Sequence, residues 1–290
     1  MESNYSILMS VYAREKPEYL EASIKSMLRQ TYLTNDFVIV KDGSLPESLE
    51  RILDFYSNKQ PNLFNIIALE ENVGLGKALD KGMNYCKNEL IARMDSDDIS
   101  LPTRCAKQIE IFNSFPEYDL IGSMVDEFCD DPAKIVTSRI VPTAHSEILK
   151  FIRRRNPFNH PTVMYRKSAV LNSGGYGGIP TRQDLDLFSR MIHKGYKATN
   201  INESLVLFRA NKNYFIRKKS WRYCKGDIYV RYRQWKRGES SLLDFTNTTV
   251  IFLVMLVSPM WLMKIVSSKM LRKPKIKRVN YVESYRKKSK

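Results

Sequence analysis

Cysteine and histidine are scarce in this sequence, and their spacing builds none of the usual zinc sites. The 290 residues include four cysteines and three histidines. No Cys-x-x-Cys pair occurs, and no histidine has metal-binding spacing from a cysteine. The pattern therefore excludes a zinc module and a disulfide framework, and we expect reduced thiols in a cytosolic protein.

Long hydrophobic runs are also missing. The first residues, MESNYSILMSVY, have neither a basic start nor a long apolar stretch, so we expect no signal peptide. Residues 250–263 are 14 in a row without a charge, but Pro259 interrupts them and roughly 20 are needed to span a bilayer. We expect this segment to form an interfacial helix. A spanning helix and a buried or oligomer-forming segment stay as alternatives.

Positive charge is concentrated at the C-terminal end. The net charge is +16, yet residues 1–208 are close to neutral. Residues 209–238 hold 11 basic residues and one acidic residue, and residues 264–290 hold the same numbers. Aromatic side chains interleave with the cations of 209–238, which is typical of nucleic-acid binding and of membrane-surface helices. The neutral body and the apolar segment that follows favour an anionic membrane surface, so we expect no nucleic acid as a partner.

Short apolar runs alternate with amphipathic segments over the first hundred residues. This alternation predicts an α/β domain with a mostly parallel sheet. The expected strands cover 6–11, 36–41, 64–69 and 89–94, and the expected helices cover 17–30, 48–57 and 74–84. Further along the chain we expect helices over 103–115 and 183–195, and strands over 118–128, 159–165 and 203–209.

Polar residues and turns follow several of these strands. They are Tyr12, Asp42, the 72–76 turn and the 95–98 acid cluster. Since ligands of open α/β sheets bind at the carboxyl ends of the strands, these features indicate one binding site at that edge.

The acid cluster comprises Asp95, Asp97 and Asp98, directly after an apolar strand. Carboxylates this close repel one another unless a cation compensates them. Oxygen ligands without histidine or cysteine favour Mg²⁺ or Mn²⁺, and Mg²⁺ commonly shares its coordination with phosphate oxygens. A metal ion with a nucleotide diphosphate is therefore the favoured interpretation. The alternative is a solvated helix start, where aspartate is a common cap.

Two other stretches carry candidate residues. The stretch NVGLGKALDKG, 72–82, matches neither the dinucleotide fingerprint nor the P-loop, but its glycine turn and Lys77 could hold a phosphate. A plain strand–helix turn explains it equally well. In QDLDLFSR, 183–190, Asp184 and Asp186 cannot share a helix face. Asp184 is a candidate general base, whereas Asp186 could cap, orient a neighbour or lie in solvent.

Taken together, these stretches resemble the family 2 glycosyltransferases over residues 6–209. The resemblance rests on SILMSVY, VIVKDGS, NVGLGKALDKG, MDSDD, NHPTVMYRKSAV, GGYGG and QDLDLFSR, in that order. It implies a GT-A nucleotide-diphospho-sugar transferase fold, with a mostly parallel central sheet flanked by helices and a C-terminal helical extension that associates with membranes. The implied domains are a catalytic domain at 1–215, a basic aromatic helical segment at 216–247, and an apolar interfacial helix with a basic tail at 248–290.

The resemblance also implies roles for individual residues. Asp184 would be the catalytic base, and Asp97 or Asp98 would hold Mn²⁺ or Mg²⁺. The residues implied to bind the nucleotide sugar are Ser10, Tyr12, Asp42, Gly74, Lys77, Asp95, Asp97 and Arg209. His160 matches a histidine common in the family, with a structural role as the alternative.

The activity implied is inverting transfer of a sugar from a UDP-sugar to a hydroxyl of a saccharide acceptor, carried on a lipid, in bacterial surface-polysaccharide synthesis. The enzyme would lie on the cytoplasmic face of the inner membrane, peripheral or monotopic. Lys41, Gln183 and Asn211 stand where the family usually has Asp, Glu and His. These departures keep open a non-catalytic, membrane-associated nucleotide-binding or scaffold protein.

Overall fold

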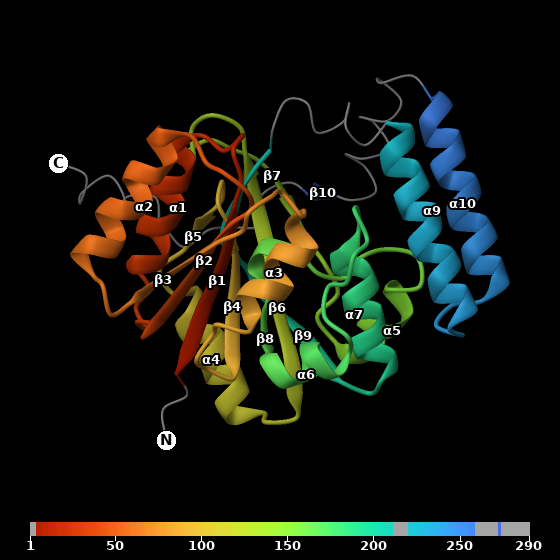
Figure 1. The fold of residues 1–290 in the computed structure, drawn as a ribbon. Coiled ribbons are helices and arrows are strands. Elements are labelled where there is room, and N and C mark those ends of the chain that lie inside the picture. Colours follow the sequence, from red (N-terminus) through yellow and green to blue (C-terminus); the bar gives the residue numbers. More distant parts are fainter. Residues whose placement is uncertain (1–3, 211–219, 259–271, 274–290) are drawn as a thin grey trace.

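The computed structural model describes residues 4–210 and 220–258, together with the backbone of 272–273. Within them, a mixed sheet of ten strands forms the centre of the molecule (Figure 1). Its order is β10-β7-β6-β8-β4-β1-β2-β3, with β9 paired to β6 and β5. Strands β3, β2, β1 and β4 are parallel, as the sequence predicts for the first half of the chain. The α/β fold class is confirmed.

The strands of the first half follow the expected runs closely. They are β1 (Tyr5–Val11), β2 (Asp36–Lys41), β3 (Phe64–Ala68) and β4 (Leu90–Asp95). The later strands are β5 (Ile99–Ser100), β6 (Tyr118–Phe128), β7 (Ile135–Arg139), β8 (Met164–Arg166), β9 (Lys197–Arg209) and β10 (Arg272–Lys273). The expected strand over 159–165 is wrong over 159–163, because a 3₁₀ turn, His160–Thr162, precedes β8.

Helices cover both faces of the sheet. They are α1 (Pro17–Leu28), α2 (Glu47–Lys59), α3 (Leu75–Met83), α4 (Arg104–Ser114), α5 (His145–Phe151), α6 (Lys167–Asn172) and α7 (Gln183–His193). In Figure 1, α1 and α2 lie on one face, and α3, α6 and α7 on the other.

Two hydrophobic cores result, one on each face. Ile7 and Met9 of β1 pack with α1, α2 and α4, whereas Leu8 between them packs with α3, α6 and α7. Successive side chains of a strand point to opposite faces, so a strand covered on both sides is apolar throughout. This explains why the first strands appear in the sequence as continuous apolar runs rather than as alternating ones.

A helical hairpin stands beside α7 and α5 (Figure 1). It consists of α9 (Trp221–Lys236) and α10 (Leu242–Val257), and Trp235 stacks on Phe245 between them. A capping box of Ser241 and Asp244 starts α10, which is why this helix begins eight residues before the apolar stretch suggests. The expected boundary between 247 and 248 falls inside α10, and 211–215 and 259–263 lie outside the described residues. None of the described helices is both long and apolar enough to cross a bilayer.

Close packing of α3 on the sheet yields a stability prediction. A Cβ on Gly82 would lie 2.4 Å from Val40 Cγ2 and 2.7 Å from Leu8 Cδ1. Overpacking of this kind lowers the free energy of unfolding by about 1–3 kcal/mol, whereas the better helix propensity of alanine raises it by at most about 1 kcal/mol. We therefore expect Gly82→Ala to lower the free energy of unfolding in urea titrations. Lys81→Ala, on the exposed side of the same helix, should change it by less than about 0.5 kcal/mol.

Candidate active site

The carboxyl ends of β1, β2 and β4 lie next to one another at one edge of the sheet. Ser10 pairs in register with Asp95 on one side and with Val40 on the other. Tyr12 follows β1 with its side chain about half exposed, and Asp42 follows β2. The structure thus brings together Ser10, Tyr12, Asp42 and the acid cluster, as expected from the order of the strands.

Asp42 organises the loop that leads into α3. Its carboxylate accepts hydrogen bonds from the backbone N–H groups of Val73 at 2.8 Å and Gly74 at 3.1 Å. Its backbone carbonyl accepts one from the side chain of Asn72. Gly74 has a φ of 87°, a left-handed conformation that suits glycine. A nucleotide contact by Asp42 stays a prediction, and the observed contacts are with the backbone of the glycine turn.

Lys77 lies in the first turn of α3, above the backbone of Gly178. A Cβ on Gly178 would be 3.3 Å from its Cε. The start of α3 has no side-chain cap, so its backbone donors are available to an anion. Asp80, which sequence reasoning missed, accepts from the backbone N–H groups of Tyr176 and Gly177 and holds that loop against α3.

The acid cluster has a positive partner within the protein. Arg93, two residues before it on β4, is almost completely buried. Its guanidinium donates two hydrogen bonds to Asp95, one of them 2.6 Å long from Nη1 to Oδ2. Such a two-pronged pair is among the stronger side-chain interactions. Asp95 is therefore paired with Arg93, and among the described residues neither Asp97 nor Asp98 has a comparable ion pair.

Asp98 is fully buried at the end of the cluster. Its Oδ1 accepts the backbone N–H of Arg209 at 2.7 Å, whereas its Oδ2 has no hydrogen-bond partner among the described residues. The Arg209 side chain donates to the carbonyl of Asp97 and lies 3.8 Å from the ring centroid of Tyr19. Arg209 thus ties the end of β9 to the acid loop.

These surroundings suit a divalent cation. Burial, followed by the negative charge of Asp95, raises the pKa of Asp97 to about 7. Burial and the charges of Asp97 and Asp95 raise the pKa of Asp98 well above its usual range. One carboxylate oxygen from each of the three residues lies within 4.8 Å of the others. The cluster and the unpartnered oxygen of Asp98 fit the all-oxygen coordination of Mg²⁺ or Mn²⁺.

Asp184 lies in the first turn of α7 and is partly buried. Its Oδ2 accepts a hydrogen bond of 2.7 Å from the side chain of Asn156, a residue that sequence reasoning missed. Burial raises the pKa of Asp184, and the Arg182 guanidinium opposes this rise most strongly, followed by the backbone N–H of Leu185 and then by Arg93. The charge of Arg93 therefore acts on the pKa of Asp184 as well as on those of Asp97 and Asp98.

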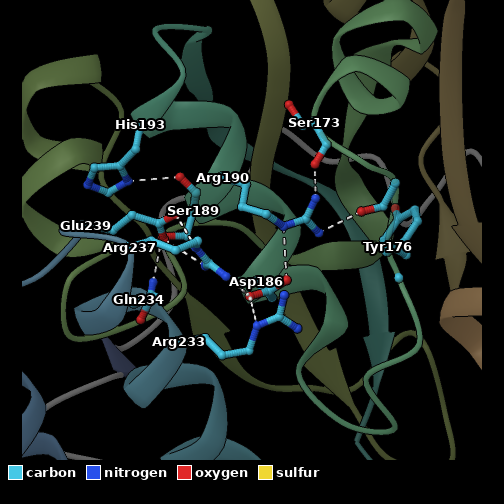
Figure 2. Close-up of polar contacts among 12 residues, drawn as sticks. Ser173, Tyr176, Asp186, Ser189, Arg190, His193, Arg233, Gln234, Arg237 and Glu239 are labelled. Carbon is cyan, nitrogen blue, oxygen red and sulfur yellow. Dashed lines mark hydrogen bonds and ion pairs between the residues drawn. The ribbon is translucent and has the colours of Figure 1, made fainter.

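Asp186 neither caps the helix nor lies in solvent. It is buried between α7 and α9, where Arg190 and Arg237 each approach it to 3.0 Å and Arg233 to 3.9 Å. Figure 2 shows these arginines pointing toward the carboxylate from the two helices. Of the roles left open by the sequence, orienting a neighbour is the one that the structure supports.

His160 and Gln183 have packing contacts. His160 Nε2 lies 3.0 Å from the hydroxyl of the buried Tyr176, and burial lowers the pKa of His160 well below its ordinary value. The ring is therefore neutral, which favours a structural role. Gln183 packs on the start of α3, since a Cβ on Gly76 would be 3.1 Å from its Cγ.

Comparison with known proteins identifies the family of the chain. Residues 6–174 match the model of glycosyl transferase family 2. The chain is 37% identical to the amylovoran biosynthesis glycosyltransferase of Erwinia amylovora, over 78% of this chain and 84% of the relative. It is 30% identical to the UDP-Gal:α-D-GlcNAc-diphosphoundecaprenol β-1,3-galactosyltransferase of Escherichia coli, over 83% and 86% of the two chains.

Two solved structures share the fold. The mannosyltransferase of Pyrobaculum calidifontis in complex with GDP-Man and Mn²⁺ aligns with a TM-score of 0.62 at 10% identity, over all of this chain and 80% of its own. TarS of S. aureus (residues 1–349) in complex with UDP-GlcNAc aligns with a TM-score of 0.61 at 15% identity, over 87% and 72%. At these identities the likeness shows the fold alone.

The buried oxygen of Asp98 leads to a test with the metal alone. Asp98→Asn keeps an oxygen that can accept from Arg209, but it removes the charge. We expect the affinity for Mn²⁺ to fall at least about tenfold in calorimetric titrations, with the melting temperature retained. Asp54→Asn, which removes a carboxylate from the exposed side of α2, should leave Mn²⁺ binding unchanged. Equal affinity in the Asp98 variant and the wild type would contradict the assignment.

Proposed function

Because the chain belongs to glycosyl transferase family 2, we propose that it transfers a sugar from a UDP-sugar to a hydroxyl of a lipid-linked saccharide, with inversion at the anomeric carbon. The observation that supports this proposal is the acid cluster at the carboxyl edge of the sheet, where one carboxylate oxygen of each of Asp95, Asp97 and Asp98 lies within 4.8 Å of the others. In this proposal the Asp184 carboxylate acts on a proton, and the acid cluster holds the cation that binds the nucleotide diphosphate.

The donor proposal rests on the site and on one relative. A diphosphate could receive backbone N–H groups from the start of α3, together with the charges of Lys77 and Arg209. The Escherichia coli relative is named for UDP-Gal, which supports a uridine nucleotide here. Tyr12, exposed at the end of β1, is available to lie against the base.

In the proposed reaction, Asp184 accepts the proton of the acceptor hydroxyl. Asn156 holds the carboxylate so that one oxygen stays engaged while the other takes the proton. The acceptor oxygen attacks the anomeric carbon on the face opposite the nucleotide, and the bond to the diphosphate breaks. A divalent cation bound by the acid cluster supplies compensation for the charge of the leaving diphosphate. A single displacement with one acting carboxylate inverts the anomeric centre.

The acceptor and the location of the enzyme are proposed from the hairpin. Along α10, Leu242, Leu243 and five apolar residues between Val250 and Val257 are exposed. Trp221 and Tyr229 are exposed on α9, among lysines and arginines. This combination is typical of helices that lie at an anionic membrane surface. The Escherichia coli relative is named for a diphosphoundecaprenol acceptor, so a peripheral position on the cytoplasmic face of a bacterial membrane would bring the site to such a substrate.

The role of Asp184 as base is tested by Asp184→Asn. An amide cannot accept the proton, so UDP release from a UDP-sugar in the presence of an acceptor should fall by about 10²-fold or more. Metal-dependent binding of UDP, measured by calorimetry, should be retained because the acid cluster is untouched. Asp131→Asn on the surface is the matched control and should keep wild-type turnover.

Two outcomes would contradict this proposal in different ways. Wild-type turnover in Asp184→Asn would contradict the assignment of Asp184 as the base but not the transferase activity. Metal-dependent UDP binding by the wild type without turnover on any saccharide acceptor would favour the non-catalytic alternative, consistent with Lys41 and Gln183 departing from the family pattern.

Membrane association is tested by Ile251→Asp on the exposed face of α10. Burying an isoleucine side chain contributes about 1.5–3 kcal/mol, so the variant should bind phosphatidylglycerol vesicles at least about tenfold more weakly in sedimentation assays. Turnover on a water-soluble acceptor should not change. Leu33→Asp, which alters an even more exposed apolar residue between α1 and β2, should leave vesicle binding unaltered. Retained binding in the Ile251 variant would refute the role of this face.

A further inference from the structure

Helix α7 begins at a backbone conformation that needs support. Arg182, its N-cap, has φ 63° and ψ 23°, and it is the one non-glycine residue with a positive φ in the described ranges 4–210 and 220–258. The left-handed region costs an ordinary residue on the order of 1 kcal/mol, and such conformations persist where the surroundings impose them. The residue two positions later is Asp184.

An ion pair with α9 holds Arg182 in place. Arg182 Nη2 donates to Asp227 Oδ2 at 2.9 Å, and Nε lies 2.8 Å from Asp227 Oδ1. The guanidinium also lies 4.6 Å from the ring centroid of Tyr223, one turn earlier on α9. Asp227 is fully buried, and removing one partner of a buried ion pair is strongly destabilising.

The backbone of α9 approaches the same segment closely. A Cβ on Gly226 would lie 1.7 Å from Thr181 Oγ1, so the side chain of Thr181 occupies the space that glycine leaves. Further along both helices, Asp186 binds Arg190 and Arg237 (Figure 2). The start of α7 is therefore held against α9 at two separate places, one on each side of Asp184.

Charges around Asp184 come from several elements. The Arg182 and Arg93 guanidinium groups lower the pKa of Asp184, and the Asp227 carboxylate raises it. The charge of Asp184 also adds to the effect of burial in raising the pKa of Tyr176, in the loop before α7. Arg182 is the largest of the opposing influences on a carboxyl group whose pKa burial raises.

We propose that Arg182, clamped by Asp227, is a positioning residue for Asp184, so that the C-terminal hairpin forms part of the catalytic apparatus. The inference rests on the proposed role of Asp184 as base. The clamp sets the direction in which the first turn of α7 presents the carboxylate, and the Arg182 cation favours its ionised form. Within the described residues, the hydrogen bonds of the Asp95 and Asp98 side chains go to Arg93 and to the backbone of Arg209, not to this pair.

The test compares three variants in kinetics with a UDP-sugar and a soluble acceptor. Arg182→Gln removes the cation and the clamp, so kcat should fall at least about tenfold while the KM for the donor stays within about twofold. Loss of the Arg182 charge raises the pKa of Asp184 further. Because a base acts only when ionised, the acid limb of the pH–kcat profile should move to higher pH, by about one unit. Arg182→Lys keeps the charge and should return the limb toward its wild-type position.

Asp227→Asn keeps the Arg182 charge but removes the ion pair, and kcat should again fall about tenfold with donor KM unchanged. Metal-dependent UDP binding reports whether each variant is folded. If Arg182→Gln does not fold, Asp227→Asn tests the inference in its place. Arg166→Gln is the matched control, because Arg166 faces Asp119 and lies over the Phe112 ring, away from Asp184. It should alter neither kcat nor the acid limb.

An unmoved acid limb in a folded Arg182→Gln, or unchanged kcat in Asp227→Asn, would overturn the inference. A raised donor KM in Arg182→Gln would overturn it as well, because it would assign Arg182 to donor binding. Failure of the base assignment is recognised separately, by wild-type turnover in Asp184→Asn.

Discussion

The candidate site depends on one buried cation. Arg93 lies on β4 with its guanidinium against Asp95, and its charge also reaches Asp97, Asp98, Asp184 and His160. A carboxylate in a poorly solvated position is costly unless a positive charge faces it. Arg93 meets this requirement for Asp95 from within the strand, and it adds to the effect of burial, which lowers the pKa of His160. The backbone around Arg93 is fixed in turn by Arg104, whose Nη2 donates to the Arg93 carbonyl at 2.7 Å.

Much of the architecture could be predicted from local sequence. Continuous apolar runs indicate strands that are covered on both faces, and β1, β2 and β4 show this with side chains in two separate cores. The carboxyl-edge rule predicts from the sequence that Tyr12, Asp42, the 72–76 turn and the acid cluster lie together. Several short motifs that occur in order indicate the family, although each is loose on its own, and the match to the family model confirms it.

The remainder depends on contacts between residues far apart in the chain. Nothing in QDLDLFSR shows that Asp186 meets Arg237, which lies 51 residues later, or that Asn156 meets Asp184. The same holds for Asp42, whose carboxylate binds a loop 31 residues away rather than pointing freely into the site. Short elements such as α5 and α6 were missed since six or seven residues carry too little periodicity to be recognised.

Asp42 and Asp80 share a feature with a consequence for how the site meets its ligands. Each carboxylate receives two successive backbone N–H groups, from Val73 and Gly74 in one case and from Tyr176 and Gly177 in the other. Ordering a residue of backbone costs about 1–2 kcal/mol of conformational entropy. In these two loops the backbone is already ordered when the chain folds, so this entropy is lost before any ligand binds. An arriving ligand therefore finds both sides of α3 already arranged, and its own interaction free energy is not consumed in ordering them.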